Sequence, residues 1–163
     1  LKKIIEIANL YHWVDSSTTD GKLPTTAFQM GVDHHGHAIY VGRTHFDNEL
    51  TPVHVVPGHK KAYVAYQGKE HPVEKYQVSH IFPEISCITR FWQLLCMNFF
   101  KWVPDHDGKV PEGAVEAGKN KDNSPLYVGR VFHEGSWIIG KVNKFSRSCF
   151  CVICDFVSDT SAV

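Results

Sequence analysis

The sequence predicts an all-β protein built from two tandem repeats. The tetrapeptide Tyr-Val-Gly-Arg occurs at residues 40–43 and again at 127–130, an offset of 127 − 40 = 87 residues. The residues around each copy are β-branched and aromatic, and neither copy has a sustained helical period. A duplicated, strand-rich segment is typical of two copies of one β unit. We therefore expect a pseudo-twofold, β-sandwich-like domain.

The offset of 87 residues extends well beyond the tetrapeptide. Gly-Lys-x-Pro occurs at 21–24 and at 108–111, and Gly31 matches Gly118. Upstream, Trp13-Val14 matches Trp102-Val103 after a shift of two residues. This self-similarity divides the chain into an N-terminal extension (1–12), a first repeat (13–78), an atypical connector (79–101), and a second repeat (102–163) that is incomplete at its C-terminus.

Each repeat is predicted to contain a central buried strand. Residues 38–46 carry apolar side chains on both faces, and Gly42 in the middle indicates a close backbone approach. Further strands are expected at 62–68 and 75–81, separated by KEHPVE, and the offset places another at 149–153. VDHHGH and FDNELTP are rich in turn-forming residues, so we expect turns there.

Two pairs of matching residues are predicted to support the strands. Arg43 and Arg130 lie in the central strands, where a buried guanidinium requires a partner. We expect carboxylates such as Glu70, or backbone carbonyls, to supply it. Trp13 and Trp102 open the two repeats and are expected to be core residues.

Composition excludes several function classes. Lys and Arg number 17, as do Asp and Glu, so no basic excess favours nucleic acid or an anionic membrane. The longest apolar segment, at 91–100, is too short to span a bilayer. None of the five Cys lies before residue 87, a distribution unlike a disulfide framework. We therefore expect free, buried thiols in CFCVIC and a cytoplasmic protein.

Two long segments resemble a known repeat. GKLPTTAFQMGVDHHGHAIYVGRTHFDNELTP, followed by AYVAYQGKEHPVEKYQV, resembles one DM-nine repeat. KWVPDHDGKVPEGAVEAGKNKDNSPLYVGRVFHEGSWIIGKV resembles a second. The resemblance implies a small all-β protein with two repeats related by a pseudo-twofold. It also implies a lectin-like protein that recognises mannose-type glycans on microbial surfaces in invertebrate innate defence.

The resemblance also implies a sugar-binding pair, an Asp in Gly-x-Asp and a Lys 21 positions later. The first repeat keeps Asp33 but has His54 at the Lys position, and the second keeps Lys141 but has Asn120 at the Asp position. Asp33 is expected to act with His54, or with Lys141 across the pseudo-twofold axis. The alternative is that Asp33 and Asn120 are turn residues that bond their own backbone.

Trp137 is the best candidate for stacking on a sugar, because it lies in the predicted turn HEGSWIIG. DHHGH (33–37) offers three His, but structural zinc favours paired ligand spacing and the second repeat has NKDNS at this place. We expect no metal and no cofactor. The sequence contains no G-x-S-x-G, G-x-G-x-x-G or Walker loop, so we expect no enzyme.

The sequence thus favours non-catalytic recognition of mannose-type glycans. Two repeats, or a homodimer, would add avidity to weak single sites. The alternative is an intracellular structural or protein-interaction module that has lost sugar binding, and the half-kept Asp/Lys pairs favour it.

Overall fold

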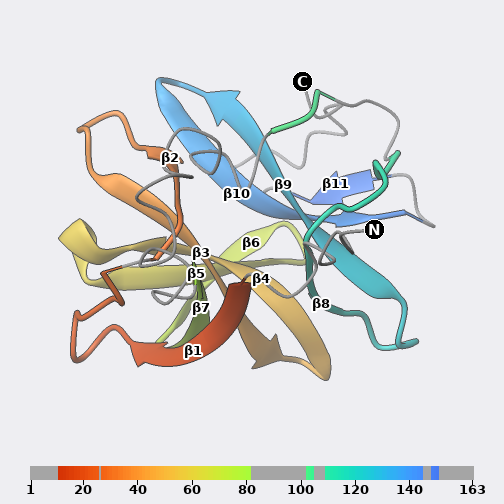
Figure 1. Ribbon diagram of the computed structural model, residues 1–163, viewed down its shortest axis with the longest axis horizontal. Coiled ribbons are helices and arrows are strands. Elements are labelled where there is room, and N and C mark those ends of the chain that lie inside the picture. Colours follow the sequence, from red (N-terminus) through yellow and green to blue (C-terminus); the bar gives the residue numbers. More distant parts are fainter. Residues whose placement is uncertain (1–10, 26, 82–101, 105–108, 145–147, 151–163) are drawn as a thin grey trace, which may run out of the picture.

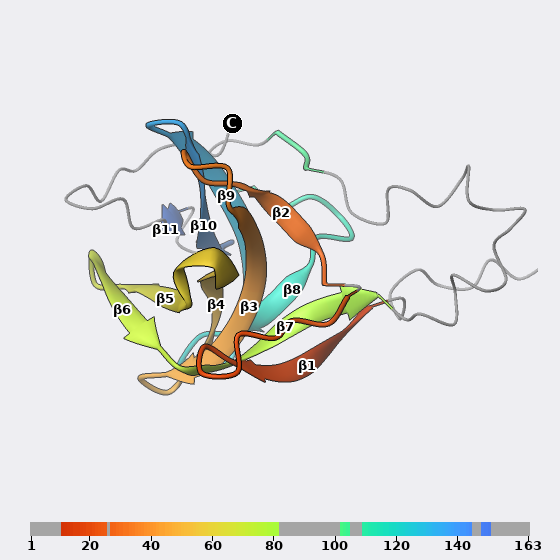
Figure 2. The same cartoon turned by 90° about the vertical axis from the view of Figure 1, so that its left-hand side faces the viewer.

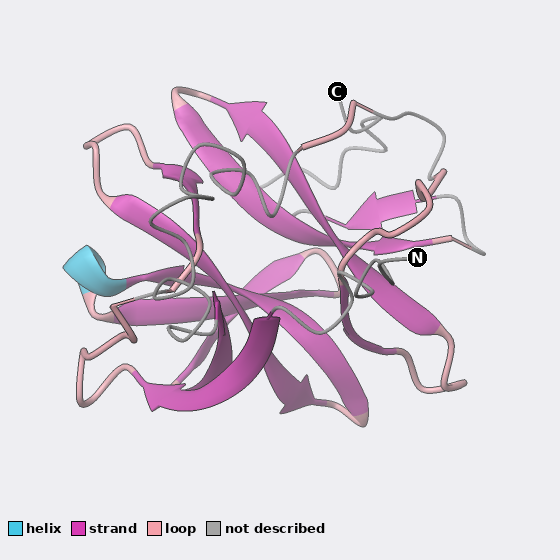
Figure 3. Ribbon diagram, viewed as in Figure 1, coloured by secondary structure: helices cyan, strands magenta, loops and turns pink. Residues whose placement is uncertain are grey.

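The computed structural model describes residues 11–25, 27–81, 102–104, 109–144 and 148–150. Within these ranges the chain forms strands joined by turns, with one short 3-10 helix, η2 (Pro57–His59) (Figure 3). The all-β prediction is confirmed. Most of the predicted connector (79–101) lies outside the described residues, as do the thiols of CFCVIC, while residues 79–81 belong to a strand.

Strands in the second repeat recur at the predicted offset. The first repeat contains β1 (Tyr11–Ser17), β2 (Gln29–Val32), β3 (Ala38–Phe46), β4 (Glu49–Val56), β5 (Lys61–Tyr66), β6 (Lys69–Val73) and β7 (Lys75–Ile81). The second contains β8 (Glu116–Lys119), β9 (Pro125–His133), β10 (Ser136–Asn143) and β11 (Ser148–Phe150). Strands β8, β9 and β10 begin 87 residues after β2, β3 and β4 (116 − 29, 125 − 38, 136 − 49). The tandem-repeat prediction is therefore confirmed.

All strands belong to one antiparallel sheet whose main path is β1-β7-β3-β4-β8-β9-β10-β11. The first repeat and the second occupy opposite corners of Figure 1, and the sheet curls strongly between them (Figure 2). Strand β4 pairs with β3 on one edge, while its other edge meets β8 at Leu50 and β5 from Val53 to Val56. Hydrogen bonding is thus continuous between the repeats and is not divided into two separate sheets.

Two predicted turns are shorter than the sequence suggested. In FDNELTP only Asp47 and Asn48 form the turn, because both adopt positive φ (47° and 63°), which matches a two-residue hairpin. Pro52 lies within β4, at the place where the second edge of that strand changes partner from β8 to β5. KEHPVE is likewise mostly strand β6, which pairs with β5.

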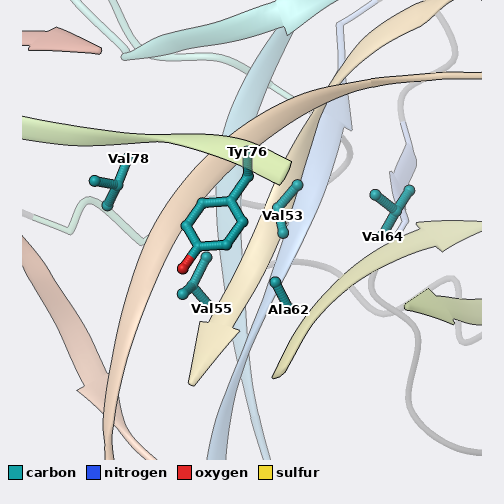
Figure 4. Packing of buried hydrophobic residues seen from close by; sticks show 6 residues of the cluster. All are labelled: Val53, Val55, Ala62, Val64, Tyr76 and Val78. Atoms are coloured by element: carbon teal, nitrogen blue, oxygen red, sulfur yellow. The ribbon is translucent and has the colours of Figure 1, made fainter. Parts of the chain in front are cut away.

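The apolar residues form two clusters. The first contains Val53, Val55, Ala62, Val64, Tyr76 and Val78, all from the first repeat (Figure 4). Gly42 lets β7 approach this cluster, because a Cβ there would lie 2.7 Å from the carbonyl oxygen of Gln77. The second cluster lies between the repeats and consists of Met30, Ile39, Val41, Val56 and Ile139, with Trp13, Trp102 and Trp137 packed against it. Trp13 and Trp102, which we expected in the core, are partly buried at its edge.

The repeats contact each other reciprocally, as a pseudo-twofold requires. Gly31 lies against Trp137, and 87 residues later Gly118 lies against Leu50, the residue equivalent to Trp137. Each glycine therefore makes room for the same position of the other repeat.

The two central arginines follow a related pattern. The guanidinium of Arg43 lies 4.5 Å from the ring of Trp13, and that of Arg130 lies 4.2 Å from Trp102. Arg130 donates to the backbone carbonyl of Met30, as predicted. Arg43 donates to the side-chain amide oxygen of Gln77, a partner that the sequence did not indicate.

Candidate functional site: two equivalent polar clusters

The turn after β2 is built by the side chain of Asp33. Its Oδ1 accepts hydrogen bonds from the backbone N–H groups of His35 and His37, both at 2.8 Å. The backbone N–H of Asp33 donates to the carbonyl of His37, and that of Gly36 to the carbonyl of Asp33. The turn after β8 has the equivalent two bonds, from Asn120 to Ser124 and from Asn123 to Asn120. Both predicted binding residues are therefore also turn residues, as the alternative interpretation proposed.

Asp33 is the centre of a polar group that we call the histidine cluster (Asp33, His37, His54 and His59). Its Oδ2 lies 3.0 Å from Nδ1 of His37 and 3.3 Å from Nε2 of His59. The two ring nitrogens are themselves 3.1 Å apart. Burial opposes ionisation of Asp33, but the hydrogen bonds from His37 and His35 outweigh it and lower its pKa to about 2. The carboxylate therefore stays charged at neutral pH.

His54 projects from β4 into the same region. Its burial lowers the pKa of the imidazole to about 4, although the charge of Asp33 favours the protonated ring. Its Nε2 is buried and has no hydrogen-bond partner among the described residues. A neutral, buried ring thus replaces the Lys that the family resemblance expects.

This shift in the pKa of His54 predicts a pH-dependent loss of stability. The folded pKa of about 4 lies below the unfolded value near 6.5, so the stabilising effect of the neutral ring is complete above that value and declines as pH falls toward 4. Between pH 7.5 and 4.5 we expect wild type to lose about 2–3 kcal/mol more than His54→Gln. Urea unfolding in EDTA measures this difference. Equal losses would contradict it, and exposed His45→Gln, as the control, should behave as wild type.

Lys141, the residue of the second repeat equivalent to His54, belongs to a different group, the Tyr66 cluster (Asp47, Glu49, Tyr66, Lys121 and Lys141). Lys121 Nζ lies 2.8 Å from Asp47 Oδ2 and 3.0 Å from the Tyr66 hydroxyl, which also donates to Asp47. These bonds to Lys121 and Tyr66 lower the pKa of Asp47. Both lysine ammonium groups lie over the Tyr66 ring, at 5.6 Å for Lys121 and 5.3 Å for Lys141.

Lys141 and Glu49 form the buried part of this cluster. Their Nζ and Oε2 atoms are 2.6 Å apart, and the side chains are only 11% and 8% exposed. Glu49 comes from β4 of the first repeat and Lys141 from β10 of the second. The pair therefore joins the two repeats, and residues of both repeats make up the cluster.

Comparison with protein families agrees with this duplicated architecture. A family model described as the DM9 repeat matches residues 4–73 and 33–155. The chain belongs to the DM9 repeat family. A search of curated proteins finds no match. Among the residues that the structure describes, no helix has the length and apolar character needed to cross a membrane.

The DM9 repeats bring together some of the predicted binding residues. Asp33 and His54 share the histidine cluster, where the charge of Asp33 acts on the His54 ring. Asn120 accepts a hydrogen bond from the backbone N–H of Lys121, so it adjoins the Tyr66 cluster that contains Lys141. Asp33 and Lys141 have different ion-pair partners, His37 and Glu49 respectively, and among the described residues no ion pair joins the two.

Trp137 lies in β10, not in a turn. The turn between β9 and β10 is limited to Glu134 and Gly135, which both have positive φ. The Trp137 ring packs against the inter-repeat core, and the Arg130 guanidinium covers one face at 3.8 Å. Its neighbour Ser136 accepts a hydrogen bond from the backbone N–H of His34, close to the histidine cluster. Stacking of Trp137 on a sugar stays a prediction.

Sequence reasoning missed most of the residues that complete the two DM9 clusters. They are His59, Asp47, Glu49, Tyr66 and Lys121, while His37 was considered only as a metal ligand within DHHGH. The register of the β3–β4 hairpin could have indicated that His37 and His59 lie close together. Tyr40 pairs with Val55, and continuing this register places residue 37 opposite residue 58, the neighbour of His59. Glu49, Tyr66 and Lys121 meet across the repeats, and no spacing within one repeat indicates that contact.

Proposed function

We propose that this protein recognises mannose-type glycans without catalysis, as a lectin-like protein of invertebrate innate defence, and that the Tyr66 cluster binds the sugar. Membership of the DM9 repeat family supports this proposal. The observation that carries it is the convergence of charged donors and acceptors around one aromatic ring, at the boundary between the repeats.

The chemistry of this cluster suits vicinal hydroxyl groups. Lys121 provides N–H donors, while Asp47 and Asn120 provide oxygen acceptors. Lys121 and Asp47 are half-exposed, so a sugar can exchange hydrogen bonds with them at the surface. The Tyr66 ring adds an apolar face to the charged groups.

The histidine cluster is a poorer sugar site by the same criteria. The two oxygens of Asp33 already face four nitrogens, two backbone N–H groups and two imidazole nitrogens. A carboxylate has about four lone-pair sites, so a sugar hydroxyl would have to displace one of these partners.

Retention on a mannan resin tests the proposal. We expect Asp47→Asn and Lys121→Met each to weaken binding about ten- to a hundredfold, because each removes a charge-assisted hydrogen bond to the sugar. Glu134→Gln is the matched control, since Glu134 occupies the position of Asp47 in the second repeat and is exposed. It should bind as wild type. Equal retention of all variants would reject the Tyr66 cluster as the sugar site.

Asp33→Asn in the same assay separates the two clusters. If the Tyr66 cluster alone binds mannan, this variant retains binding. A loss confined to Asp33→Asn would transfer the sugar site to the histidine cluster.

The second candidate function is a structural or protein-interaction module that has lost sugar binding. The carboxylate of Asp33 favours this function, because its oxygens already have four nitrogen partners. Phe132 on β9 also favours it, because this apolar side chain beside Trp137 is 58% accessible. Absence of mannan retention by wild type would support this second function.

A further inference from the structure

We propose that Asp33, His37 and His59 form a binding site for a divalent transition-metal ion such as Zn²⁺. Each residue offers one donor atom, Oδ2, Nδ1 and Nε2 respectively, and these three atoms lie close to one another. The sequence led us to expect no metal, because the spacing within DHHGH does not match a zinc motif. The third ligand, His59, comes instead from η2 after β4, 22 residues beyond His37.

The size of the triangle formed by these atoms fits a metal ion. Its edges are 3.0 Å (His37 to Asp33), 3.3 Å (His59 to Asp33) and 3.1 Å (His59 to His37). Zinc binds imidazole nitrogen and carboxylate oxygen at about 2.0–2.2 Å, so adjacent ligands lie about 3.0 Å apart at right angles and about 3.4 Å apart in a tetrahedron. The three donors therefore need little movement to hold the ion.

The protonation chemistry of the two rings also suits this role. A neutral imidazole holds one proton, and a ligating nitrogen must be free of it. The outer nitrogens, Nε2 of His37 and Nδ1 of His59, make no hydrogen bond to any residue that the structure describes, so each can hold its proton toward solvent. The inner nitrogens then present their lone pairs to the ion.

The surroundings hold the ligands in place. Backbone N–H groups bind Oδ1 of Asp33 and leave Oδ2 toward the two rings. The His37 ring lies on Gly58, where a Cβ would come within 2.8 Å of its Cδ2 atom. His37 and His59 are 42% and 38% exposed, so the ion has a path from solvent and an open position for water.

The second repeat provides an internal contrast. Asn120 and Ser124 occupy the positions of Asp33 and His37, and neither is a favoured zinc ligand. The two clusters have thus diverged in chemistry. The metal site shares no residue with the Tyr66 cluster, so it does not depend on the proposed function.

Calorimetric titration of the full chain with ZnCl₂, after EDTA treatment and in a reducing buffer, tests the proposal. We expect wild type to have a zinc site that His37→Ala and His59→Ala each weaken at least about tenfold. Exposed His45→Ala is the control for adventitious binding by the other histidines and should titrate as wild type. Lys121→Met should also bind zinc normally, even where it loses mannan retention.

Thermal unfolding provides a second readout. Zinc should raise the melting temperature of wild type and of His45→Ala, but not that of His59→Ala. The metal-free melting temperature of each variant establishes that it folds. The proposal is overturned if wild type takes up no zinc, or if the His37→Ala and His59→Ala variants bind it as tightly as wild type does.

Discussion

Lys141→Met is expected to lower the free energy of unfolding by about 3–5 kcal/mol, because it leaves the Glu49 carboxylate buried without its cation. Glu49 is only 8% exposed, and Lys141 Nζ lies 2.6 Å from it. The methionine side chain occupies similar space, so loss of the charge, and not a cavity, accounts for the effect. Urea unfolding at neutral pH measures it.

The double variant Lys141→Met/Glu49→Leu distinguishes this mechanism from simple loss of packing. With both charges removed, most of the lost stability should return. Lys121→Met is the surface counterpart, since Lys121 forms a half-exposed pair with Asp47 at 2.8 Å, and we expect little change there. A double variant that is less stable than Lys141→Met would contradict the mechanism.

Gly118→Ala should destabilise the fold by about 3 kcal/mol or more, at the upper end of the usual cost of overpacking. A Cβ at Gly118 would overlap the carbonyl oxygen of Leu50 in β4. This atom belongs to the backbone at the only pairing of β4 with β8, between Leu50 and Lys119. The strand cannot move away without losing the backbone pairing that makes the sheet continuous between the two repeats.

Gly31→Ala is the matched variant in the first repeat. There a Cβ would lie 2.9 Å from the side chain of Trp137, which is easier to displace than backbone. We expect a smaller loss, of about 1–2 kcal/mol. Chemical denaturation of both variants tests the order, and an equal or greater loss for Gly31→Ala would be evidence against the backbone argument.

The repeat made much of the fold predictable. Once the offset of 87 residues is known, the central strand at 38–46 predicts its copy at 125–133, and both are found. Turn boundaries were less accurate, because Glu49–Pro52 contains residues that favour turns, and pairing with β3 overrides that preference. The continuous sheet could not be predicted either, because β4 and β8 are joined by a single residue pairing, Leu50 with Lys119.

The candidate sites were predictable only in part. The resemblance to the repeat family identified one residue of each cluster, Asp33 and Lys141, which match the Asp and the Lys of the family's sugar-binding pair. It could not identify their actual partners, His37 and Glu49. His37 follows from hairpin register, whereas Glu49 reaches Lys141 from 92 residues away, through packing of the two repeats. Such a contact depends on tertiary structure, for which the sequence offers no local signal.

The crossed contacts have a consequence for how the two copies evolve. By sequence Glu49 belongs to the first copy, but by contact it belongs to the cluster of the second. Ser136 is its counterpart 87 residues later and contacts His34 of the first copy. A duplicated gene segment usually frees one copy to vary while the other keeps its role. At these two positions neither copy is free in this sense, because a change of Glu49 or Ser136 alters the surroundings of the other copy.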